Sequence, residues 1–262
     1  MMGHSHALSG AAGWLAIAST TPISVNLLHV HGVAPVLLGA AVASGAALLP
    51  DLDHHAATAT RALPPVTTII GKIVGTFSGG HRHGTHSLVG IAATTALAVA
   101  ASRWCWAVPA DFAGLPLLHY LGGWLAPGRT LQLGAALYAF VLVGLGLTTM
   151  KLMPGKTLAW LAGVVGAVLV TFAAPATTWW LPVAVAVGAL AHCVGDSLTT
   201  EGIPWLWPLT PKPVIETPFW KKNGYMGIPI LGETGGAREW LLSVALIGYT
   251  VLAAVLAIRG AR

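Results

Sequence analysis

The residues of this sequence that could carry chemistry are histidines and aspartates gathered in short clusters. Of eleven histidines in 262 residues, seven fall in three polar clusters, and an eighth, His192, lies four residues before Asp196 in an apolar segment. Imidazole with carboxylate, and without thiolate, is the ligand set of hydrolytic zinc, manganese or iron sites. The sequence therefore predicts a divalent metal site. The three clusters are His4 and His6, then Asp51, Asp53, His54 and His55, then His81, His83 and His86.

His192 and Asp196 form the best-defined pair, because residues four apart on a helix project from the same face. A metal can therefore lie between the imidazole and the carboxylate. Ionisable groups inside membrane segments are costly and tend to line a cavity or a pathway, which favours a functional role. The alternative is a hydrogen bond between the two side chains that only ties helices together.

Asp51 and Asp53 directly follow an apolar segment that ends at Pro50. They lie at the bilayer boundary, and they point roughly alike if the chain is extended there. Two such carboxylates repel each other unless they share a cation; the alternative is a helix cap and a turn. The segment from His81 to Ser87 holds three imidazoles, which exceeds what capping of the next helix needs. For that segment the alternative is a solvated loop with incidental histidines.

Composition places these clusters in a membrane protein. Only 8% of the residues are charged, 55% are hydrophobic and the mean hydropathy is +0.76, which excludes an ordinary soluble globule. We expect an all-α fold, a polytopic transmembrane helical bundle of about seven spans that forms a single integral membrane domain over residues 1–262. Phe112–Ala126 is short and broken by glycine and proline, as in a re-entrant or interfacial segment. The expected spans are Ala7–Leu28, which polar residues interrupt, Val33–Leu49, Ser87–Val108, Leu131–Met150, Thr157–Ala174, Trp179–Leu198 and Trp240–Ile258.

The thirteen Lys and Arg residues are scattered singly between the apolar segments, so they indicate topology and not nucleic-acid binding. With the N-terminus inside, nine of them face the cytoplasm and four face the outside, which obeys the positive-inside rule. All the clusters of histidine and aspartate then lie on the cytoplasmic face of the membrane.

The two cysteines and three isolated histidines do not indicate a functional site, and the N-terminal segment does not indicate cleavage. Cys105 and Cys193 form no CxxC pair, so they indicate neither a disulfide framework nor a thiolate zinc site. His29, His31 and His119 belong to no cluster, and we expect them to be interfacial or core residues. The N-terminal segment lacks the basic region of a cleaved signal peptide, so we expect it to be retained.

Three strings of this sequence resemble motifs of the YdjM-like family of membrane-bound metal-dependent hydrolases. LLPDLDHH matches the family's PDxDH element, GHRHGTHSLV its GHRxxTHS element, and AHCVGDSLTTEGIPWLWP its HxxxDxxTxxGxxxLWP element. The motifs occur in order over most of the chain, and the resemblance implies a hydrolase. The pattern is also more distantly similar to that of zinc-dependent phospholipase C enzymes. Carried over residue by residue, the family's polar positions are His6, Asp51, Asp53, His54, His81, Arg82, Thr85, His86, Ser87, His192, Asp196, Thr199 and Gly202.

We therefore expect a metal-dependent hydrolase, multi-pass in the bacterial inner membrane, with its site facing the cytoplasm. Water activated by one to three divalent metals, zinc or alternatively manganese or iron, would attack a phosphoester in a lipid or other amphiphilic substrate presented by the bilayer. Arg82 would neutralise charge on phosphate oxygens, while His54, His81 or an Asp not bound to metal would act as general base or acid. The alternatives are a metal or proton transporter, or a structural module tied by its metal. The expected metal ligands are His6, Asp51, Asp53, His86, His192 and Asp196.

Overall fold

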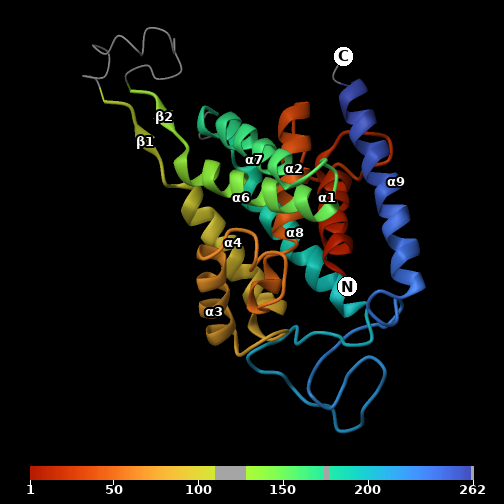
Figure 1. Cartoon of the computed structure of the whole chain (residues 1–262). Helices are drawn as coiled ribbons and strands as arrows, with labels where there is room; N and C mark the ends of the chain where they lie inside the picture. Colours follow the sequence, from red (N-terminus) through yellow and green to blue (C-terminus); the bar gives the residue numbers. More distant parts are fainter. Residues whose placement is uncertain (110–127, 174–176, 261–262) are drawn as a thin grey trace.

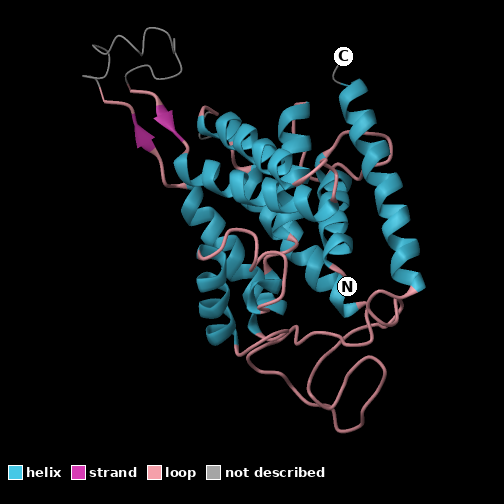
Figure 2. Ribbon diagram, in the orientation of Figure 1, coloured by secondary structure: helices cyan, strands magenta, loops and turns pink. Residues whose placement is uncertain are grey.

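A computed structural model describes residues 1–109, 128–173 and 177–260 of the chain. This part is mostly helical, as expected (Figure 2). The predicted re-entrant segment Phe112–Ala126, with His119, lies outside the described residues. The helices are α1 (Gly3–Ala18), α2 (Val33–Ala46), α3 (Val66–Ser78), α4 (Leu88–Ser102), α6 (Leu133–Met150), α7 (Lys156–Thr171), α8 (Trp180–Ser197) and α9 (Ala237–Gly260), with the short 3-10 helices η1 (Pro50–Asp53) and η2 (Gly84–His86).

Four segments of the described chain are long and apolar enough to cross a membrane, so the expectation of about seven spans is not confirmed. These segments are Val33–Asp53, which joins α2 to η1, Leu133–Met150, Trp180–Ser197 and Ala237–Gly260. The other three expected spans contain α1, α4 and α7, which are 15 or 16 residues long. At 1.5 Å per residue such a helix covers roughly 24 Å of a hydrocarbon core about 30 Å thick.

The end of α1 illustrates why apolar runs overestimate helix length. The helix stops at Ala18 because the next residues satisfy one another's polar groups locally. The hydroxyl of Ser24 lies 2.7 Å from the carbonyl of Ser19 and 2.6 Å from that of Thr21, and the hydroxyls of Ser19 and Thr21 are 3.2 Å apart. Short polar side chains that bond to nearby backbone compete with helix formation in this way.

Two elements were not expected from the sequence. The amphipathic helix α3 lies within the polar connection between the second and third expected spans, with Ile69, Ile73 and Phe77 exposed on one side and Thr67 and Gly71 buried on the other. A pair of two-residue antiparallel strands, β1 (Trp106–Ala107) and β2 (Thr130–Leu131), adds a small sheet to the expected all-α fold. Figure 1 shows this ribbon beyond α4 and α6, far from the N-terminus.

The core of the bundle lies around α2, which packs against α1, α6 and α8. Glycines bring these helices close together: a Cβ on Gly188 of α8 would lie 2.7 Å from the Cβ of Ala46 and 2.8 Å from the amide nitrogen of Ala47. Small residues at helix crossings allow such close approach in membrane bundles. The end of α8 is therefore held against the end of α2.

Four chain segments meet at one end of the bundle. They are the start of α1, η1 after α2, η2 before α4, and the end of α8; Figure 1 shows the N-terminus beside the last turns of α8. The segment from Thr199 to Gly236 crosses this end and returns the chain to α9. The helix α9 then runs along α1, and only 11% of its span is buried.

Candidate metal centre

Four side chains from three of these segments form the core of the site. The Nε2 atoms of His86 and His192 are 3.0 Å apart. The Oδ1 atom of Asp51 lies 3.5 Å from Nε2 of His86 and 3.7 Å from Nε2 of His192. The Oδ2 atom of Asp196 lies 3.6 Å from each of these two nitrogens. Each of the two imidazole nitrogens therefore lies close to both carboxylate oxygens.

The imidazole of His192 is oriented by the backbone of α2. Its Nδ1 lies 2.7 Å from the carbonyl oxygen of Ala47, one turn beyond the close contact at Gly188. A ring nitrogen facing a carbonyl must donate a proton, so the other nitrogen, Nε2, presents its lone pair to Asp51, His86 and Asp196. Such a hydrogen bond from the far side of the ring is characteristic of metal-binding histidines.

His86 is oriented by Asp53 and Thr85. Its Nδ1 lies 2.9 Å from the hydroxyl of Thr85 and 3.5 Å from Oδ2 of Asp53, which also accepts a 2.5 Å hydrogen bond from that hydroxyl. Burial lowers the pKa of His86, but hydrogen bonds with Asp51 and Asp53 outweigh it and raise the pKa to about 9. The surroundings of His86 therefore favour a positive charge at this position.

Asp53 differs from Asp51, although the sequence suggested that both would point alike. In the 3-10 helix η1 residues two apart point in different directions, so an extended arrangement of the two carboxylates is ruled out. Asp53 turns away from the core and lies 2.9 Å from Nδ1 of His81 while accepting a 3.1 Å hydrogen bond from the amide of Arg82. It belongs to none of the groups of converging ligand atoms among the described residues. Asp53 therefore anchors the segment that carries His86.

Arg82 is held in this loop in a left-handed conformation, with a φ of 58° that is strained for a residue other than glycine. Its carbonyl accepts a 2.8 Å hydrogen bond from the hydroxyl of Tyr225. Its guanidinium lies 3.5 Å from Oδ2 of Asp196 and 3.9 Å from the exposed carboxylate of Glu201. The loop thus brings a fixed positive charge to the edge of the core.

His6 joins the site from α1. Its Nε2 lies 3.2 Å from Oδ1 of Asp196, and its ring stacks on that of His192 with a centroid separation of 3.7 Å. The amino group of Met1 also contacts Oδ1 of Asp196. The Nδ1 atom of His6 is buried and has no hydrogen-bond partner in the described part of the chain. An unpaired buried nitrogen is costly, so this atom is a further candidate ligand.

His81 and His54 lie on the more open side of the site. The side chain of His81 is 39% exposed, and its ligand atoms converge with those of Asp51 and His86, so it could bind a metal as well as transfer protons. The ring of His54 lies 4.6 Å from that of His81. Burial, together with the charges of His81 and His55, lowers the pKa of His54, which favours its neutral form.

The residues present fit a divalent cation. Three groups of three converge, each with its ligand atoms within 4.8 Å of one another, and they combine imidazole and carboxylate without thiolate. Metal–ligand bonds of about 2.0–2.2 Å allow two ligands of one ion to be at most roughly 4.4 Å apart. The distances from the two imidazole nitrogens of the core to each other and to the two carboxylate oxygens meet this limit. The groups are His6, Asp51 and His192; Asp51, His81 and His86; and His86, His192 and Asp196.

The remaining histidines of the described chain and both cysteines lie outside the core of the site. His4 packs against Trp240, His83 lies against Tyr225 and His55 is exposed, so none of these extra histidines joins a converging group among the described residues. His29 and His31 are exposed near the opposite end of the bundle. Both cysteines are free, Cys193 being buried. Tyr225 and the buried Glu239 were not predicted from the sequence.

Glu239 supports the site from the first turn of α9. It accepts hydrogen bonds from the amides of Met2, at 2.6 Å, and Gly235, at 2.8 Å. A carboxylate at a helix N-terminus is stabilised by the helix dipole, and this one also fixes the start of α1. Glu239 could have been recognised from the sequence, because it is an acidic residue at the edge of an apolar segment.

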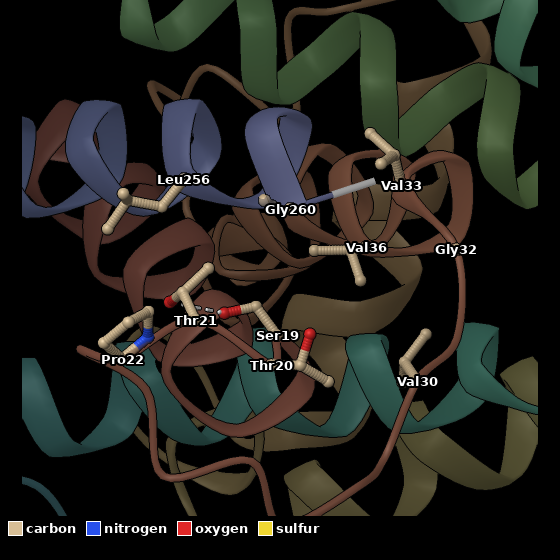
Figure 3. Close-up of a pocket in the computed structure, with 11 residues that line it drawn as sticks. Ser19, Thr20, Thr21, Pro22, Val30, Gly32, Val33, Val36, Leu256 and Gly260 are labelled. Atoms are coloured by element: carbon tan, nitrogen blue, oxygen red, sulfur yellow. Dashed lines mark hydrogen bonds between the residues drawn. The ribbon is translucent and has the colours of Figure 1, made fainter. Parts of the chain in front are cut away.

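A hollow lies at the end of the bundle opposite to the metal centre, where α1 ends, α2 begins and α9 ends. It encloses about 390 Å³, and Figure 3 shows Ser19 and Thr21 joined by a hydrogen bond beside Val36 and Leu256. Among the described residues, its lining contains hydroxyls but no histidine or carboxylate. It therefore offers no donor set for a divalent metal.

The fold and the site together define an integral membrane protein with a buried cluster of histidine and aspartate at one end, able to hold a metal ion. The chain belongs to the YdjM inner membrane protein family, whose family model matches residues 1–261. No curated protein and no solved structure matches it.

Proposed function

We propose that this protein is a membrane-bound metal-dependent hydrolase that cleaves a phosphoester in a lipid or other amphiphilic substrate at the membrane surface. The observation that carries the proposal is the convergence of His86, His192, Asp51 and Asp196 beside Arg82. Zinc is the preferred metal, with manganese and iron as alternatives, because the donors are nitrogen and oxygen only. A divalent cation would supply the positive charge that polarises a phosphoryl oxygen.

The residues around the core have separable tasks in this proposal. The side chain of Arg82 is 16% exposed at the edge of the site. Its guanidinium binds oxygens of the phosphoryl group and stabilises the charge that develops on them. His81 and His54 lie on the open side, where an imidazole can take a proton from the attacking water or give one to the leaving oxygen. Asp53 orients His86 and holds the loop that carries Arg82.

The position of the site supports a substrate delivered by the bilayer. The ligands lie at the ends of membrane-spanning segments, so the reacting group of an amphiphile can reach them while its apolar part stays in the lipid. We propose that this end faces the cytoplasm, as the excess of Lys and Arg in its connections requires. Thiol labelling of two variants, Glu201→Cys and Leu27→Cys, which lie at opposite ends, tests the orientation. Labelling of the Glu201→Cys variant from outside the cell would reverse it.

A structural metal is the second candidate, and burial favours it. The side chains of His6, His86 and His192 are 0–1% exposed and come from separate segments, so a metal here would tie α1, η2 and α8 together. A transporter has less support, because the described residues that line the hollow at the opposite end include no histidine or carboxylate that could continue an ion path.

The deciding experiment uses the full chain purified with metal and reconstituted in lipid nanodiscs. Elemental analysis gives the metal content, and release of phosphate from phospholipid and from a soluble phosphodiester gives the activity. We expect bound metal and metal-dependent hydrolysis that Arg82→Gln lowers while the metal stays bound, with the opposite-end variant Thr21→Val as the control. Stoichiometric metal without hydrolysis would leave the structural role, and metal flux across vesicles would favour transport.

A further inference from the structure

An apolar groove runs along the bundle between α1, α8 and α9. Its floor is made of small residues, among them Ala12 and Ala16 of α1 and Ala191 and Gly195 of α8, while Leu246 of α9 forms part of the opposite wall. It encloses about 390 Å³, within the range of roughly 300–1,000 Å³ typical of ligand pockets. Carbon atoms make up almost all of its lining, so it suits a hydrocarbon ligand.

The groove opens toward lipid. Its wall α9 is a candidate span of which only 11% is buried, so the outer side of this helix faces the bilayer. The lining residues of α9 extend from Leu242 to Tyr249, which lies seven residues further along the helix. At 1.5 Å per residue this is about 10 Å, which fits within one leaflet, since half of the hydrocarbon core is about 15 Å thick.

One end of the groove adjoins the candidate metal centre. Gly195 lines it and has no side chain, and an atom placed at its Cβ position would lie 3.4 Å from Nδ1 of His6. That nitrogen is the buried one without a hydrogen-bond partner. The next residue, Asp196, belongs to the core of the centre. The sulfur of Met1, which also lines the groove, lies against the same Cβ position.

We propose that this groove holds the hydrocarbon chain of a bilayer lipid and sets the lipid's polar linkage beside His6 and Asp196. The proposal rests on the proposed function for the identity of the reacting group, a phosphoester, and it adds the class of substrate, a lipid with at least one long chain. The occupant is a hydrocarbon chain and not a peptide, because the lining offers almost no polar partner for a backbone. Entry is lateral, from the leaflet on the side of the centre.

The test uses the full chain in nanodiscs that contain a phospholipid with a photoactivatable diazirine in its acyl chain. After illumination, mass spectrometry should find crosslinks enriched in the groove, at residues such as Ala16 and Leu246. Ala16→Leu and Ala191→Leu should lower this labelling about tenfold, because the added side chains fill the groove. Ala245→Leu makes the same change on the exposed side of α9 and should leave the labelling unchanged. Metal content should be normal in all three variants.

Labelling spread evenly over the exposed helices, or unchanged in both filled variants, would overturn the proposal, as would crosslinks that join two copies of the chain through the groove. Rates of hydrolysis provide a separate test of the proposed substrate class. Ala191→Leu should slow the cleavage of a long-chain phospholipid about tenfold and leave that of a short, soluble phosphodiester unaffected. If neither substrate is cleaved but groove labelling is enriched and sensitive to filling, the hydrolase function fails while the lipid groove stands.

Discussion

The two ends of the bundle are built largely from the same helices and differ in kind. At one end, the start of α1 and the ends of α2 and α8 contribute ionisable side chains such as His6 and Asp196, which are almost completely buried. At the other end, the end of α1, the start of α2 and the end of α9 enclose a hollow whose described lining has only hydroxyls as polar side chains (Figure 3). Apolar helices alone therefore do not create the site. It is created by a few ionisable residues at the helix ends on one side of the bundle.

The hydrogen bonds at the two ends also differ in range. Ser19, Thr21 and Ser24 satisfy one another within six residues of chain. The bonds of His192 instead reach Ala47 and His86, 145 and 106 residues away. Neutral hydroxyls can be buried with local partners, whereas buried charges need long-range partners or a cation, because desolvation of a charge is much more costly.

The largest effect should follow from Asp196→Asn. The amide keeps the size of the side chain and most of its hydrogen bonds but removes the charge that a metal requires. Metal affinity should fall by more than about a hundredfold, the upper limit for residues that only support ligands. Competition titration with a metal-binding dye measures the loss. Thr21→Val, at the opposite end, is the control, and near-normal affinity in a folded Asp196→Asn protein would remove this residue from the centre.

Removal of the metal should destabilise the whole bundle, because the candidate ligands tie separate segments together. At a free metal concentration of 100 times Kd, binding stabilises the folded state by about 2.7 kcal/mol. A chelator should therefore lower the thermal transition of the wild-type protein by several degrees and have no such effect on Asp196→Asn. Equal transitions with and without chelator would show that the metal does not join the segments.

Asp53→Asn should have a smaller effect than Asp196→Asn, since Asp53 supports His86 and does not enter the core. We expect metal affinity to fall about tenfold, the lower limit for residues that orient metal ligands. The same dye titration compares the two variants directly. A loss as large as that of Asp196→Asn would mean that Asp53 is itself a ligand, as the sequence suggested.

Ser24→Ala should have the smallest effect, and this effect should be limited to the stability of the fold. The hydroxyl supports the carbonyls of Ser19 and Thr21 after the end of α1, and such a bond contributes about 1 kcal/mol. The thermal transition should fall slightly while metal affinity stays at the wild-type value. A change in metal affinity would show that the two ends of the bundle are coupled.

The sequence predicted the membrane class and the family, and the structure brings His6, His86, His192, Asp51 and Asp196 together. Hydropathy could not predict the length of α1, because composition does not reveal where local hydroxyl bonds end a helix. The apolar runs also overestimated α4 and α7, which end at Ser102 and Thr171. Hydropathy also missed α3, whose apolar side chains alternate with polar ones along the helix.

The finer roles within the site also depended on backbone geometry. Asp51 and Asp53 are separated by one residue, yet the 3-10 turn of η1 sends the first to the core and the second to the loop of Arg82. The spacing of His81 did not reveal that it converges with Asp51 and His86, since that depends on the path of the chain from α3 to η2.

The separation of the ligands along the chain has a consequence for biogenesis. About 190 residues lie between His6 and Asp196, and both contact each other only after α8 has entered the membrane. At a synthesis rate of about 5–20 residues per second, His6 waits on the order of 10–40 s for this partner. By then the ribosome has already synthesised α2 and α4, together with Asp51 after α2 and His86 before α4. A metal ion held by both His6 and Asp196 would therefore bind only after α8 has inserted, and it would stabilise only the completed bundle.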